Sequence, residues 1–465
     1  MSRAIGKETP VRPARKHRSL STTRIILLGF LAVILLGSLL LSLPFSAADG
    51  ERVPYVDALF TATTATCVTG LVTLPTATAW SLFGQIVILL LAQIGGLGVI
   101  TVMAGVMLAL QRRMGLSDRL LLQDAFNLNT LSGLLDFLKK VLLGTLVVET
   151  VGALLYMTVF VPEFGARGIW ISVFNAVSAF CNAGMDVIGE TSLCEYATHP
   201  TVNGVTAALI ILGGLGYIVW WDVIRVIRMA VSSRSLAPLR RLTLHTKMAL
   251  SATAVLLLGG GLLFFLFERE NPATIGGLSV LDGLQISFFQ SVTTRTAGFA
   301  TVPQGSLTTA STVLSLLLMF IGGSPVGTAG GVKTVTVLVI LAYAVSTLRG
   351  RNEVTVFHRR IQRDALRKSV AVAVTSLAIA LAATLLLAAV TGGDLADILY
   401  ETVSATATVG LSRDLTPTLN TAGKLIVVAA MYLGRVGPIS LAIAFTTQRD
   451  NPNTVQNPTE TISVG

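Results

Sequence analysis

One short pattern, polar or small residues ending in glycine, occurs four times in this chain at nearly even spacing. The four final glycines lie 114, 114 and 112 residues apart, and an aromatic residue stands ten positions before each of them. The segments are Thr66 to Gly70, Phe180 to Gly184, Thr294 to Gly298 and Thr406 to Gly410. Each lies between long apolar stretches, so the repeat predicts four similar units around one polar passage in a membrane.

Composition supports a membrane location. Of the 465 residues, 52% are hydrophobic and 12% are charged, and the mean hydropathy is +0.75. This is more apolar than a soluble domain needs to be. The net charge of +10 raises the question of nucleic-acid binding. The basic residues flank the apolar stretches, however, so we expect no nucleic-acid partner.

The placement of charge predicts the orientation. Basic residues gather in the tail 1–24 and in three later loops, whereas the alternate loops carry mainly acidic residues. Basic loops favour the cytoplasmic side of a membrane. We therefore expect both termini in the cytoplasm and the four glycine segments near the outer face.

The predicted fold is an all-α integral membrane protein of four tandem units. Each unit is a spanning helix, a re-entrant pore loop and a second spanning helix, which gives eight transmembrane helices in a pseudo-fourfold arrangement around one pore. The units are 25–110, 138–229, 247–346 and 368–446, and 447–465 is a C-terminal tail. The second helices, expected at 82–110, 203–229, 310–346 and 422–446, share a glycine-rich point at similar depth. Close helix packing and a cavity lining both explain these glycines.

The second helix of the third unit contains a long interruption from Gly322 to Thr334. Proline removes a hydrogen-bond donor and each glycine costs about 1 kcal/mol relative to alanine in a helix. We expect two half-helices joined by irregular backbone, which membranes tolerate only where it lines a cavity. A Walker A loop needs glycine directly before its lysine, but Val332 precedes Lys333. No nucleotide site is predicted here.

The four segments suit a dehydrated alkali cation. Backbone carbonyls turned inward can replace its water shell, and glycine makes such a turn at low cost. The C-terminal ends of the re-entrant helices add partial negative charge. Arg295 is expected behind the passage, paired with Glu401. The candidate potassium-filter residues are Thr66, Cys67, Val68, Thr69, Gly70, Cys181, Asn182, Ala183, Gly184, Thr294, Arg295, Thr296, Ala297, Gly298, Thr406, Ala407, Thr408, Val409 and Gly410.

These motifs, in this order, resemble the Ktr/Trk/HKT superfamily of potassium transporters. The resemblance covers about residues 20 to 446 and rests on the four segments, the interrupted helix and the stretch Gly434 to Pro438. Trk-type subunits usually carry two additional N-terminal helices, so the bacterial Ktr membrane subunits are the better match. In plant relatives a serine in place of the first glycine goes with sodium preference, and Gly70 therefore favours potassium.

The resemblance implies a channel-like subunit for potassium uptake in the bacterial cytoplasmic membrane. It also implies a homodimer with one pore per protomer on a cytoplasmic ring of KtrA-type subunits that bind ATP or ADP. Under this reading the interrupted helix is a gate under the control of the ring, and Arg435 projects toward it. The gate residues are Gly322, Gly323, Ser324, Pro325, Gly327, Thr328, Ala329, Gly330, Gly331, Lys333 and Arg435.

Three alternatives stay open from the residues alone. Broken helices also mark sodium- or proton-coupled secondary carriers, although Glu149, an acid within a spanning helix, belongs to neither a filter segment nor a broken segment. An intramembrane enzyme has little support, because Gly322 to Val326 lacks the last glycine of the Gly-x-Ser-x-Gly motif. The basic stretch from Arg349 to Lys368 is by default solvated, with a partner protein or membrane lipid as its possible ligands.

Overall fold

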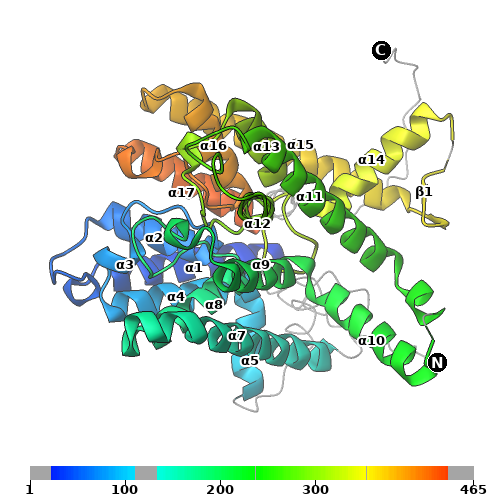
Figure 1. Cartoon of the computed structure of the whole chain (residues 1–465), viewed down its shortest axis with the longest axis horizontal. Coiled ribbons are helices and arrows are strands. Elements are labelled where there is room, and N and C mark those ends of the chain that lie inside the picture. Colours follow the sequence, from blue (N-terminus) through cyan, green and yellow to red (C-terminus); the bar gives the residue numbers. More distant parts are fainter. Residues whose placement is uncertain (1–21, 110–133, 236, 352, 438–465) are drawn as a thin grey trace, which may run out of the picture.

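The computed structural model describes residues 22–109, 134–235, 237–351 and 353–437, and these are mainly helical (Figure 1). Each of the four units begins with one long helix. These helices are α1 (Thr22–Leu41), α7 (Leu134–Phe164), α11 (Leu244–Glu268) and α15 (Arg363–Val390). Each is long and apolar enough to cross a membrane. Leu36, Leu146, Leu258 and Leu385 on these helices are more than 60% exposed, as expected of surfaces that face lipid.

A shorter, largely buried helix follows each long one. The short helices are α2 (Tyr55–Cys67), α8 (Ala166–Cys181), α12 (Val280–Thr293) and α16 (Leu395–Ala407). They contain 13 to 16 residues. At about 1.5 Å per residue they are roughly 20–24 Å long, too short for a hydrocarbon layer of about 30 Å. They have the length of re-entrant helices.

The second helices of the first two units are bent, and the prediction of one continuous helix over 82–110 and over 203–229 is wrong. Helix α4 (Leu82–Leu97) meets α5 (Val99–Ala109) at 100°, and α9 (Pro200–Leu215) meets α10 (Tyr217–Ser233) at 99°. The joints are Gly98 and Gly216, with φ of +87° and +86°. The sequence marks the glycines but not which one adopts the left-handed conformation that breaks the helix.

The third and fourth units end differently. In the third unit, α13 (Thr309–Phe320) and α14 (Thr334–Leu348) are separate helices, which confirms the predicted pair of half-helices. In the fourth unit, α17 (Thr421–Val436) ends at Gly437, which has a φ of +86° like Gly98 and Gly216. The predicted continuation of this helix to residue 446 lies outside the described residues, as do the tail 1–21, the loop 110–133 and the C-terminal tail.

Small elements complete the described chain. Between α14 and α15, strands β1 (Thr355–Val356) and β2 (Arg359–Arg360) form an antiparallel hairpin that pairs Thr355 with Arg360 and Val356 with Arg359. The short helices elsewhere are α3 (Thr76–Ala79), η1 (Pro44–Ser46), η2 (Cys194–Tyr196), η3 (Ala237–Arg241), η4 (Gln304–Ser306) and η5 (Thr416–Thr418).

The four units close into one body because the last unit packs against the first. Colours follow one another around the molecule in Figure 1, and the orange and red α17 lies beside the blue helices. A buried apolar cluster joins Ile34, Phe60 and Leu71 of the first unit to Leu387 and Val427 of the fourth. Nearby, Lys424 Nζ on α17 pairs with Asp57 Oδ1 on α2 at 2.6 Å. This closure brings the four glycine segments together.

Candidate functional site

Each re-entrant helix leads into a segment with two left-handed residues. Every segment has a positive φ at its final glycine and at the residue two positions before it. The non-glycine members are Val68, Asn182, Thr296 and Thr408, with φ between 53° and 66°. Such conformations are uncommon outside glycine and are held by the surrounding structure. The sequence predicts the glycine turn but gives no signal for the second turn.

The four glycines form a closed ring. A β-carbon added to Gly70 would lie 2.8 Å from the carbonyl oxygen of Ala183, and one added to Gly184 would lie 2.7 Å from that of Ala297. The third and fourth contacts continue in the same direction: Gly298 to Val409 O at 2.7 Å, and Gly410 to Thr69 O at 2.1 Å. The last contact returns to the first unit. Each glycine therefore leaves room for a carbonyl of the next segment around one axis.

A hydroxyl group from each re-entrant helix braces its segment. Thr64 Oγ1 accepts from Gly70 N at 2.9 Å, and Ser404 Oγ accepts from Gly410 N at 3.0 Å. In the other two units the hydroxyl donates instead, Ser178 to Met185 O at 2.5 Å and Thr293 to Phe299 O at 2.6 Å. These four braces fix the backbone of the segments. No local pattern in the sequence marks these hydroxyls.

A cavity of about 380 Å³ opens above the ring and is lined by all four glycines. Asp186, Glu190 and Asp414 also line it, and none of the described residues that line it is basic. Burial raises the pKa of Asp186 to about 6, although the amide of Ile188 donates to its carboxylate at 3.3 Å. At neutral pH this mouth is negative and attracts cations.

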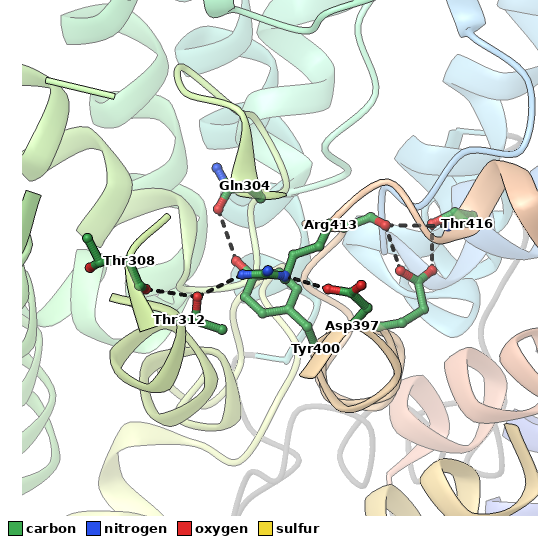
Figure 2. Close-up of polar contacts among 9 residues, drawn as sticks. Gln304, Thr308, Thr312, Asp397, Tyr400, Arg413 and Thr416 are labelled. Carbon is green, nitrogen blue, oxygen red and sulfur yellow. Dashed lines mark hydrogen bonds and ion pairs between the residues drawn. The ribbon is translucent and has the colours of Figure 1, made fainter. Parts of the chain in front are cut away.

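Polar contacts join the third and fourth units near this mouth (Figure 2). Tyr400 donates to Gln304 Oε1 at 2.9 Å. The guanidinium of Arg413 donates to Asp397 Oδ1 at 2.7 Å and to Thr312 Oγ1 at 2.8 Å (Figure 2). These contacts fix the fourth segment against α13, the half-helix that leads into the interruption.

The expected pairing of Arg295 with Glu401 is wrong. Glu401 is fully buried and accepts hydrogen bonds from Ser412 Oγ at 2.6 Å and Thr416 Oγ1 at 2.5 Å. Both hydroxyls come from the loop that follows its own segment, so local contacts satisfy the carboxyl group. Arg295 is also buried, and its Nε and Nη2 atoms have no hydrogen-bond partner among the described residues.

The interruption between α13 and α14 lies directly beneath the ring segments. Thr328 Oγ1 donates to Phe180 O at 2.9 Å, and Gly330 N donates to Thr296 Oγ1 at 3.1 Å. A β-carbon added to Gly330 would lie only 1.9 Å from Thr408 Oγ1. The loop thus contacts the second, third and fourth segments at once.

Backbone hydrogen bonds hold this loop to the bend of the second unit. Ser324 N donates to Gly214 O at 2.8 Å, and Thr328 N donates to Gly213 O at 3.1 Å. Within the loop, Ser324 Oγ lies 3.0 Å from Thr334 Oγ1. The glycines at the bend have no side chains, which allows the loop to approach so closely.

Two basic residues hold the loop from below. Arg435 Nη1 donates to Thr328 O at 2.7 Å, and its Nη2 donates to Gly95 O at 2.5 Å, so one guanidinium links the loop to the bent α4. The Nζ of Lys333 donates to Ala329 O, within the loop itself, at 2.6 Å. Both residues line a cavity of about 280 Å³ below the fourth segment.

Glu149 contacts a glycine segment and a bent helix, although in the sequence it belongs to neither a filter segment nor a broken segment. Gln93 Nε2, on the bent α4, donates to Glu149 Oε2 at 3.3 Å, and Cys181 Sγ of the second segment lies 3.9 Å from Glu149 Oε1. Glu149 is 6% exposed. Only tertiary packing brings this acid of α7 beside the second segment.

The arrangement can pass a small dehydrated cation. Each of the four glycines lies close to a carbonyl oxygen of the next segment, the helices α2, α8 and α16 end at their segments with their partial negative charge, and acids line the outer mouth. An anion would meet negative charge at each of these points. The fold and the site thus define a multi-pass membrane protein with one cation pathway enclosed by four units of a single chain.

Comparison with known proteins gives the family. The family described as "TrkH: Cation transport protein" matches residues 14–456, and the chain belongs to it. The family comprises transporters rather than enzymes. The chain is 39% identical over 430 residues to "Ktr system potassium uptake protein B" of Bacillus subtilis, covering 92% of this chain and 94% of that protein.

Two further similarities cover nearly the whole chain. "Potassium/sodium uptake protein NtpJ" of Enterococcus hirae is 37% identical over 458 residues, which cover 97% of this chain and 99% of that protein. The crystal structure of the potassium transporter TrkH from Vibrio parahaemolyticus has a TM-score of 0.73 at 17% identity and covers 94% of this chain and 87% of that one. The latter similarity establishes the fold.

Proposed function

We propose that this protein takes up potassium through the ring of four glycines, as a channel-like subunit of the bacterial cytoplasmic membrane. The observation that carries the proposal is the closed sequence of glycine-to-carbonyl contacts from Gly70 through Gly410 and back to Thr69. Four carbonyls at such a ring replace the hydration shell of a cation. The names of the Ktr relatives supply potassium as the ion.

The gate in this proposal is the loop from Gly322 to Lys333 together with Arg435. Support comes from its place under three ring segments and from the contact of Arg435 with Thr328 O. A positive charge on this side opposes cation passage until it moves. A homodimer on a KtrA-type ring that binds ATP or ADP would bias the loop from the cytoplasm, where both termini of the chain lie.

Ion flux in liposomes tests the proposal. Purified protein should pass potassium in preference to sodium, and addition of the nucleotide-binding ring should change the flux. Gly298→Ser should reduce the potassium-to-sodium ratio, since its β-carbon would lie 2.7 Å from Val409 O. Gly204→Ala is the control, because a β-carbon there has nothing within 4 Å. An unchanged ratio in Gly298→Ser would reject the ring as the selective site.

A sodium- or proton-coupled carrier is the second candidate, and Glu149 is the observation that favours it. A buried intramembrane acid beside Gln93 and Cys181 is a typical place for a coupling ion or proton. In the channel-like mechanism, Glu149→Gln retains potassium flux and no second gradient drives it. In the carrier mechanism the variant loses coupling. Flux at clamped membrane potential, with and without sodium and proton gradients, separates the two. The name of the Enterococcus hirae relative makes sodium the first ion to test.

A further inference from the structure

A groove of about 280 Å³ runs along α14 toward the β1–β2 hairpin. One wall is an apolar stripe of Leu338, Leu341, Ala342 and Val345. Their spacing of three, four and seven residues puts them on one face of the helix. Leu341 is 55% exposed and Val345 is 45% exposed, so this wall is open to the surroundings of the protein.

With the interruption at mid-membrane and the orientation proposed above, the length of α14 fits the inner half of a bilayer. The helix begins at Thr334, directly after the loop beneath the ring, and ends at Leu348 after 15 residues. At about 1.5 Å per residue, Val345 lies roughly 16 Å from the start of the helix, about the half-thickness of a hydrocarbon layer. In that position, the residues that follow Leu348 would be at the level of the lipid headgroups. In Figure 1, the hairpin lies at the far end of α14 from the four units.

The other end of the groove is basic. Arg349 and Arg351 line it, and both are exposed. Buried Ser346 fixes the turn that carries them, because its Oγ donates to Glu353 O at 2.9 Å and Arg351 N donates to Ser346 O at 2.9 Å. Gly350 has a φ of +63° and completes the turn.

These two arginines have no carboxylate partner among the residues that the structure describes. The acid of the hairpin, Glu353, pairs with Arg360 at 2.8 Å. Other basic residues follow at Arg359, Arg363, Arg367 and Lys368. The headgroup end of the groove thus carries positive charge that the nearby chain does not neutralise.

We propose that this groove binds an anionic phospholipid of the inner leaflet. An acyl chain lies along the stripe from Leu338 to Val345, and the phosphate lies between Arg349 and Arg351. A guanidinium binds phosphate oxygens with two parallel hydrogen bonds. The negative charge of an anionic headgroup neutralises part of the positive charge of the arginines. A zwitterionic headgroup also brings a cationic group, which the arginines repel. The apolar wall requires a ligand with a hydrocarbon part, which a free phosphate lacks.

Lipid titration of the purified full-length chain in detergent tests this site. Native mass spectrometry counts bound phosphatidylglycerol and, in parallel, phosphatidylcholine with the same acyl chains. The double variant Arg349→Gln/Arg351→Gln should bind phosphatidylglycerol roughly thirtyfold more weakly, which corresponds to about 2 kcal/mol for two arginines at an anionic headgroup. Arg228→Gln/Arg241→Gln removes two exposed arginines elsewhere and should have no effect.

A second variant probes the apolar wall with both arginines in place. Leu341→Trp fills the groove and should also weaken phosphatidylglycerol binding, while an unchanged melting temperature without lipid shows that the chain is folded. Equal affinity for the two lipids, or equal loss in both arginine double variants, would overturn the proposal. So would a change in oligomer mass without a change in lipid count, because a second copy would then occupy the groove. None of these measurements requires ion transport, so they stand apart from the proposed function.

Discussion

The guanidinium of Arg435 donates to the backbone carbonyl of Thr328 at 2.7 Å, across 107 residues of sequence. The same side chain reaches Gly95 O on the bent α4. Arg435 therefore holds the loop beneath the ring while it adds a positive charge to the cation pathway. In the proposed gate, both the anchor and the charge would oppose passage of a cation.

Removal of this side chain should open the pathway. We expect Arg435→Ala to increase potassium flux in liposomes several-fold, because the loop loses an anchor and the cavity loses a charge. Arg435→Lys retains the charge, but a single ammonium cannot replace the guanidinium fork that contacts both carbonyls. The potassium flux of this variant should therefore lie between that of the wild type and that of Arg435→Ala. Flux in Arg435→Ala at or below that of the wild type would contradict this role.

Contact between Gly330 and Thr408 should limit what the loop tolerates. Gly330→Ala puts a β-carbon 1.9 Å from Thr408 Oγ1, so we expect a loss of about 1–3 kcal/mol in stability. Thr408→Ala removes that hydroxyl, which is buried and has no hydrogen-bond partner among the described residues, and should recover part of the loss in the double variant. Thermal unfolding of the four proteins measures the coupling. Gly259→Ala is the control, because a β-carbon there has open space around it and should not change stability. If the effects of Gly330→Ala and Thr408→Ala were strictly additive, the contact between these residues would be excluded.

The hydroxyl braces should control selectivity. Thr64→Val leaves the buried Gly70 N–H without its acceptor, at a cost of about 1–3 kcal/mol, and lets the first segment relax. We expect a lower potassium-to-sodium flux ratio, with a similar effect for Ser404→Ala. Thr150→Val is a matched control, because that exposed hydroxyl donates to Leu146 O of its own helix. Equal ratios in Thr64→Val and Thr150→Val would rule out this function of the brace.

The ion pair between Lys424 and Asp57 should stabilise the closure of the four units. Its side chains are 17% and 10% exposed, and it joins α17 to α2. Lys424→Met and Asp57→Asn should each lower stability by about 1–3 kcal/mol, and the double variant by less than the sum. Arg269 and Glu270 form an exposed pair for comparison, where the coupling should be below about 1 kcal/mol. Thermal unfolding checks both cycles, and coupling no larger at Lys424–Asp57 than at the exposed pair would contradict the prediction.

The sequence predicted much of the fold, because hydrophobic length and glycine spacing are properties of local stretches. Long apolar runs marked α1, α7, α11 and α15, and the stretch from Gly322 to Thr334 marked the split between α13 and α14. The bends at Gly98 and Gly216 were missed. Each bend lies within a cluster of glycines, and no feature of the neighbouring sequence distinguishes the glycine that adopts a positive φ.

Local patterns in the sequence are enough to predict a four-unit membrane chain with glycine-ended segments at matched positions. Tertiary structure alone decided the order of contacts around the ring, the return of the fourth unit to the first, and the partners of the buried charges. Glu401 bonds to Ser412 and Thr416 rather than to Arg295, and Glu149 meets Gln93 and Cys181. A charge in a low-dielectric interior is stabilised by the polar groups that packing brings within a few ångströms, and that distance is not encoded in any local pattern.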